Sequence, residues 1–158
     1  LGVQYLKAGE AERAVEALRS AVKLSPAAFT PRLNYGVALL EKRRFAESES
    51  ELRQALKINE ASSTAHLYLG LALVNRRGGD QAAELRRYEE AEKEFQRAAS
   101  LGGDQMGLAH YYLGGIYWRK RDYKRAADEL ETYLKLSPRA TEPERERARN
   151  AVKELRSK

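Results

Sequence analysis

The sequence repeats itself every 34 or 35 residues, and this spacing constrains the fold more than any other feature. Glycine recurs at a step of 34 in the first half, at Gly2, Gly36 and Gly70. In the second half, matching residues recur at a step of 35: Tyr88 and Tyr123, Ala91 and Ala126, Phe95 and Leu130, Ala98 and Tyr133. One structural unit therefore occurs four times, with about nine extra residues in the third copy.

Each copy has the pattern of two helices. In the second copy, Leu33, Val37 and Leu40 follow helical spacing, and a second apolar set begins at Phe45 after four polar residues. Recurring Gly and Ala would let paired helices approach closely. No stretch alternates in the two-residue period of a half-buried strand. We therefore predict an all-α fold of helix pairs.

The recurring residues resemble those of the tetratricopeptide repeat, a 34-residue helix–turn–helix unit. That family has Gly at the eighth place, a small residue at the twentieth, an aromatic residue or Leu at the twenty-fourth and Ala at the twenty-seventh. The four copies place there Gly2, Ala14, Leu18 and Ala21; Gly36, Ser48, Leu52 and Ala55; Gly70, Ala91, Phe95 and Ala98; and Gly114, Ala126, Leu130 and Tyr133. The resemblance covers nearly all of residues 1–140. It implies an open, right-handed α-solenoid of antiparallel helix pairs.

We expect a single domain over residues 1–158. Its repeats are expected at about 1–28, 29–62, 63–105 and 106–140, followed by a capping helix at 141–158. The first repeat is truncated, because Leu1 falls inside its first helix. The chain begins without Met and looks like a fragment, so its localisation stays open between cytoplasm and periplasm.

Two segments depart from the regular repeat. An insertion near residues 76–86 contains a Gly-Gly turn followed by Asp80, a helix N-cap residue, and we predict that it extends the next helix by about two turns. Tyr133 replaces the expected Ala, which indicates that the last repeat packs on something other than a regular repeat. The capping helix supplies an apolar stripe for this purpose: Ala148, Ala151, Val152 and Leu155, opposed by Arg145, Arg149, Lys153 and Arg156.

Catalytic and metal-binding motifs are missing from the sequence. It has no phosphate-binding loop, dinucleotide fingerprint, zinc-protease motif or nucleophile elbow, and it has no Cys. His66 and His110 share one repeat place, but we find no carboxylate or third His at matching spacing, so we interpret both as packing residues. We predict no enzyme activity, no catalytic residue, no metal and no cofactor. The longest uncharged run, of 15 residues, is shorter than the ~20 that a membrane span needs.

The candidate site comes from the resemblance. In the family, the fifth, ninth and twelfth places of the first helix line a concave groove. Here those places are apolar or Gly throughout, and we call them the apolar strip: Leu33, Val37, Leu40, Leu67, Leu71, Val74, Tyr111, Gly115 and Trp118. Trp118 and Tyr111 are typical interface anchors, and Asn34, Asn75 and Arg119 are expected at a polar rim. We therefore predict a non-catalytic scaffold that binds an apolar peptide or helix of an unidentified partner protein.

One known function of the family is disfavoured. Some members clamp a C-terminal carboxylate with Lys, Asn and Arg side chains. This chain keeps only Asn34 at a matching place, and has Val3, Thr64 and Tyr68 at three others. We therefore expect an apolar peptide or amphipathic helix laid in the groove, and no carboxylate clamp.

Two alternative functions stay open. The chain could form homo-oligomers through the severed first repeat and the groove, in which case the strip is covered by another copy; it could also be covered by the chain's own tail. Less favoured is a nucleic-acid-binding module, since the net charge of +6 comes with interleaved acidic residues. Its candidate residues are Arg119, Lys120, Arg121, Lys124 and Arg125.

Overall fold

A computed structural model describes residues 10–103, 106–137 and 140–158. Within these ranges the chain forms eight helices and no strand, so the all-α prediction is confirmed. The helices are α2 (Ala11–Leu24), α3 (Phe29–Glu41), α4 (Phe45–Ile58), α5 (Ser63–Asn75), α6 (Gln81–Leu101), α7 (Met106–Arg119), α8 (Tyr123–Leu136) and α9 (Glu142–Arg156).

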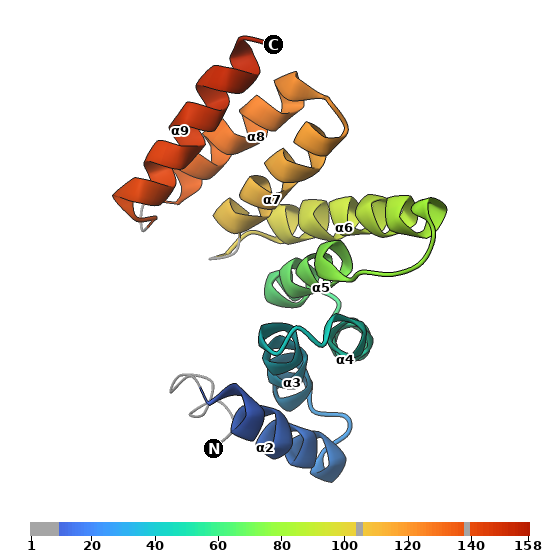
Figure 1. The fold of residues 1–158 in the computed structure, drawn as a ribbon. Coiled ribbons are helices and arrows are strands. Elements are labelled where there is room, and N and C mark those ends of the chain that lie inside the picture. Colours follow the sequence, from blue (N-terminus) through green and yellow to red (C-terminus); the bar gives the residue numbers. More distant parts are fainter. Residues whose placement is uncertain (1–9, 104–105, 138–139) are drawn as a thin grey trace.

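The helices stack in chain order, with α2 and α9 at opposite ends of the molecule (Figure 1). α3 pairs with α4, α5 with α6 and α7 with α8, and each pair packs on the next. The first helices of the pairs also meet directly, α3 with α5 and α5 with α7. These three helices carry the apolar strip, so its residues follow one another along the stack.

A close contact between glycine and a large side chain joins the two helices of each pair. A Cβ atom at Gly36 would lie 2.7 Å from Leu52 Cγ, and one at Gly70 would lie 2.5 Å from Phe95 Cε1. At Gly114 it would lie 3.0 Å from Leu130 Cγ. Glycine at the eighth place and a large side chain at the twenty-fourth place therefore occur in the same repeats. The large side chain fills the space that the missing Cβ of the glycine leaves.

The insertion lengthens α6. This helix begins at Gln81, seven residues before Tyr88, whereas α4 and α8 begin at the equivalent places, Phe45 and Tyr123. The Asp80 carboxylate accepts a hydrogen bond from the backbone N–H of Ala83 at 2.7 Å and caps the new start. The predicted extension of about two turns is confirmed.

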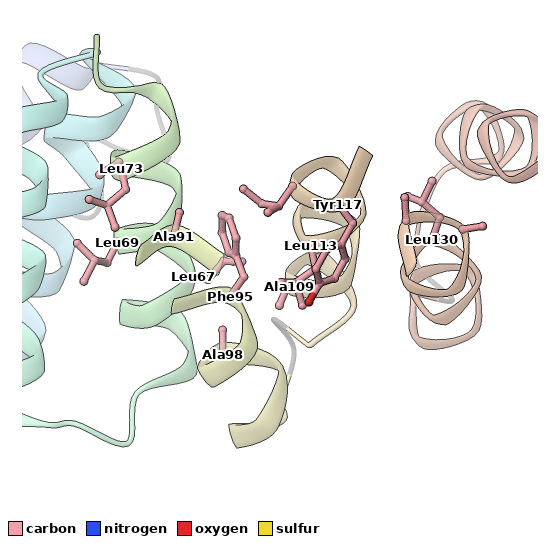
Figure 2. Close-up of a cluster of buried hydrophobic side chains, with 14 of the residues drawn as sticks. Leu67, Leu69, Leu73, Ala91, Phe95, Ala98, Ala109, Leu113, Tyr117 and Leu130 are labelled. Carbon is pink, nitrogen blue, oxygen red and sulfur yellow. The ribbon is translucent and has the colours of Figure 1, made fainter. Parts of the chain in front are cut away.

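The core runs along the stack in two clusters. The larger one extends from Leu52 to Leu155, and Figure 2 shows its centre, where the fully buried Phe95 lies among side chains of neighbouring helices. The smaller one joins α2 to α3: Ala14, Val15, Leu18, Tyr35, Ala38 and Leu39. The apolar stripe of α9 is confirmed, since Ala148 and Leu155 are buried and Ala151 and Val152 pack against the larger cluster.

We expect Gly70→Ala to lower the free energy of unfolding by about 1–3 kcal/mol, because the new methyl group overlaps the Phe95 ring. Gly115→Ala is the matched control on α7. A Cβ there meets nothing within 4 Å, so this change should raise stability by up to about 1 kcal/mol through helix propensity. Urea unfolding followed by circular dichroism measures both. Equal effects of the two substitutions would contradict the proposed packing.

Candidate functional site

The apolar strip is increasingly accessible toward α7. Leu33, Leu40, Leu71 and Val74 are half-buried and pack against the larger core cluster, and Val37 is also half-buried. On α7, Tyr111 is 44 % exposed, Trp118 is 54 % exposed and Gly115 is open to solvent. Large accessible apolar side chains of the strip are therefore concentrated on α7.

Leu67 does not belong to the accessible surface. It is 1 % exposed and lies in the cluster around Phe95 (Figure 2). The prediction that it contacts a partner is therefore wrong. The physical reason is that α5 is apolar around most of its circumference, so that its fifth place packs inward as well as its eighth, Gly70.

Two of the three expected rim residues are occupied by contacts within the chain. The Asn75 side-chain amide donates a hydrogen bond to the Leu71 carbonyl at 2.8 Å, one turn back in its own helix. The Arg119 guanidinium donates to Glu84 at 3.1 Å and lies 4.3 Å from the centre of the Tyr88 ring, which holds it against α6. The half-buried Asn34 is the rim residue for which no such contact is found among the described residues.

A pocket of about 390 Å³ lies between α7 and α9, and we call it the end pocket. Tyr111, Gly115 and Trp118 of the strip line one side. Residues of α9 line the other, among them Arg147, Ala151 and Glu154. The tail therefore does not seal Trp118 from solvent; it forms a wall beside it.

Aromatic side chains pack together on the α7 side of the end pocket, and one of them, Tyr112, was not among the predicted site residues. Tyr112 stacks on Phe95 at 5.3 Å between ring centres. Tyr111 meets Tyr112 edge-on at 5.4 Å and Tyr133 at 5.2 Å, so four rings connect α6, α7 and α8. Tyr112 occupies the same repeat place as Asn34, and this equivalence could have identified it as a residue of the site.

The two histidines have carboxylate partners that the sequence reasoning did not find. His66 Nδ1 lies 2.6 Å from Glu94 Oε2, and His110 Nδ1 lies 2.5 Å from Glu129 Oε2. Glu94 and Glu129 also share one repeat place, so each histidine pairs with the second helix of its own repeat. No group of three or more possible metal ligands occurs among the residues that the structure describes.

His66 has two hydrogen-bond acceptors around one ring. Its second nitrogen, Nε2, lies 2.9 Å from the Glu60 carbonyl. Burial alone would lower the pKa of His66, but the hydrogen bonds to Glu94 and Glu60 and the charge of Glu94 raise it above its ordinary value. Only the protonated ring can donate to both acceptors. The folded state therefore favours the imidazolium.

Stability should consequently fall as the pH rises above 6.5, the ordinary pKa of histidine. The stabilisation from His66 is complete below its unfolded pKa of 6.5 and is lost as the pH passes through the raised folded value. Urea midpoints measured across this range test the slope. In Glu94→Gln, which removes the charged acceptor, the slope should become smaller. A slope unchanged by Glu94→Gln would show that other groups cause it.

The basic residues near the end of α7 are largely paired. Arg119 binds Glu84, Lys120 binds Glu92 and Arg125 binds Asp122. Three of the five cations considered for nucleic acid thus have acidic partners, which reduces the local excess of positive charge. In the part of the chain that the structure covers, no helix has the length and apolar character needed to cross a membrane.

The comparisons with known proteins agree on the fold. The sequence model of the tetratricopeptide repeat matches residues 1–63, 36–85 and 76–141. No curated protein sequence matches the chain.

Solved structures resemble the chain at low sequence identity. TTC0263, a thermophilic tetratricopeptide repeat protein of Thermus thermophilus, has a TM-score of 0.78 and 20 % identity, over 98 % of this chain and 77 % of its own. MamA 41-end from Desulfovibrio magneticus RS-1 has a TM-score of 0.72 and 24 % identity, over 86 % and 71 %. The first repeat domain of Spaghetti (RPAP3), bound to the HSP90 peptide SRMEEVD, has a TM-score of 0.63 and 24 % identity, over 75 % and 86 %.

Proposed function

The chain belongs to the tetratricopeptide repeat family of protein-interaction scaffolds, and we propose that it binds an apolar peptide or amphipathic helix of a partner protein along the apolar strip. The observation that carries this proposal is the exposure of Trp118. A tryptophan that is more than half exposed, beside the exposed Tyr111, is costly in water and typical of an interface anchor. The ligand would cover both rings, and no catalytic step is involved.

The geometry of α7 suits a ligand that lies close to the helix. Tyr111, Gly115 and Trp118 are spaced at i, i+4 and i+7, so they share one face. Because nothing lies within 4 Å of the position of a Cβ atom at Gly115, a partner side chain can enter between the two rings. Leu71 and Val74 of α5 would then contribute the half-buried continuation of the strip.

The ligand should differ from a peptide held by its C-terminal carboxylate. This chain keeps Asn34 of the family's clamp, whereas Thr64 and Tyr68 replace two of its cationic residues. An internal apolar segment, which needs no terminal carboxylate, matches the strip better. The HSP90 peptide bound by RPAP3 is therefore not the proposed ligand.

Trp118→Ala should weaken peptide binding about tenfold or more while leaving the helical content intact, because it removes the anchor from an exposed position. Random peptides displayed on phage would be selected on the intact chain. Their affinities would then be measured by fluorescence anisotropy of the synthetic peptides. Leu85→Ala is the matched control, since Leu85 is similarly exposed, at 56 %, but lies on the extension of α6.

Equal affinities for the wild type and Trp118→Ala would reject the strip as the binding surface. Light scattering across protein concentrations tests the competing role in self-assembly. A mass that rises with concentration in the wild type and not in Trp118→Ala would assign the strip to a second copy of the chain.

A further inference from the structure

We propose that the end pocket selects partner segments in which one large apolar side chain is accompanied, within about one helical turn, by an Asp or Glu side chain. The apolar side chain would enter the pocket between α7 and α9, and the carboxylate would pair with Arg147. This inference rests on the proposed function, because it concerns the same partner, and it adds what that partner must contain.

The pocket exists because α9 does not pack as another first helix would. α3 and α5 approach each other within 8 Å between Cα atoms, as do α5 and α7, whereas no Cα of α9 comes that close to α7. α9 packs on α8 instead, to the far side of α8 from α7 in Figure 1. The space that a further repeat would fill is left open.

Tyr133 gives the last repeat a different side chain from the other repeats at this end of the stack. At the same repeat place, Ala55 and Ala98 are fully buried and small, whereas Tyr133 inserts a ring that is 5 % exposed and lies 5.2 Å from the ring of Tyr111. The first turn of α9 is fixed beside it, since the Arg145 guanidinium donates to the carbonyls of Leu134 at 3.2 Å and Ser137 at 3.0 Å. Arg145 thus holds the start of α9 against the end of α8.

The lining of the pocket fits a large apolar side chain. Aromatic residues of α7, Tyr111 and Trp118, face small residues of α9, Ala148 and Ala151. Its volume of about 390 Å³ lies at the small end of the range for ligand sites, about 300–1,000 Å³. One aromatic or long aliphatic side chain can occupy it, whereas the backbone of a whole helix must stay outside.

The positive charge at the pocket comes from Arg147 and is only partly offset by Glu144, whose pKa is lowered mainly by its hydrogen bonds to Thr141 and also by the charge of Arg147. Arg147 lines the pocket, and no ion pair or hydrogen bond of its side chain is found within the described residues. Glu154, two turns further along α9, is paired with Lys158 at 2.7 Å. Glu144, one turn before Arg147, accepts hydrogen bonds from the backbone and hydroxyl of Thr141. A carboxylate of the partner protein would accept charge-assisted hydrogen bonds from the Arg147 guanidinium.

Peptides selected on the intact chain test the pocket directly. They are synthesised with amidated C-termini, so that any carboxylate belongs to a side chain. Ala151→Leu places extra bulk in the pocket and should weaken their binding about tenfold or more. Asn150→Leu places the same leucine side chain at the exposed neighbouring position of α9 and should change affinity by less than about twofold.

Arg147→Glu tests the charge without disturbing the core, because Arg147 is exposed. It should weaken binding of acidic peptides about tenfold, and replacing the peptide's Asp or Glu by Lys should restore binding to this variant. Such a reciprocal exchange requires contact between the two charges. Peptides without acidic residues, or Arg147→Glu without effect, would overturn the assignment of the carboxylate.

The outcomes separate the two proposals. If Trp118→Ala weakens binding but Ala151→Leu and Arg147→Glu do not, the ligand follows the strip and the end pocket is not its site. If none of the three substitutions weakens binding, the strip itself is rejected. If all three do so and Asn150→Leu does not, both the strip and the pocket are supported.

Discussion

The contact between a glycine and the large side chain facing it sets the geometry of the whole stack. Gly70 and Phe95 show it most clearly, because no Cβ atom fits between them. This contact fixes how closely the two helices of a pair approach, and the pairs then stack so that α3, α5 and α7 lie in succession. The strip can be continuous only because each pair is built in the same way.

Much of the fold could be predicted from the sequence because its signals are local and repeated. Glycine spacing identified the helix pairs, and Asp80 followed by strong helix formers identified the extension of α6. The outward face of α5 could not be predicted in the same way. Residues 65–74 of this helix are apolar apart from His66, so periodicity does not distinguish the buried Leu67 from the half-buried Leu71.

The candidate site was only partly predictable, since it depends on side chains that meet across the stack. Tyr133 indicated an irregular last repeat, but only the structure shows that its ring packs against Tyr111 of α7 and that α9 packs on α8 and not on α7. Likewise, the carboxylates that pair with His66 of α5 and Arg119 of α7 both lie on another helix, α6. They are Glu94 and Glu84, respectively. Long side chains reach such partners by rotamer choices that sequence spacing does not specify.

The division of the core into two clusters has a consequence for how the molecule comes apart. Among the described residues, α2 packs into the small cluster that it shares with α3, whereas the helices from α4 to α9 share the larger one. In a solenoid, each element is stabilised mainly by its neighbours, so opening can begin at one end without melting the rest. Trp118 lies on α7, a helix of the larger cluster, so local opening of the small cluster would leave its helix in place.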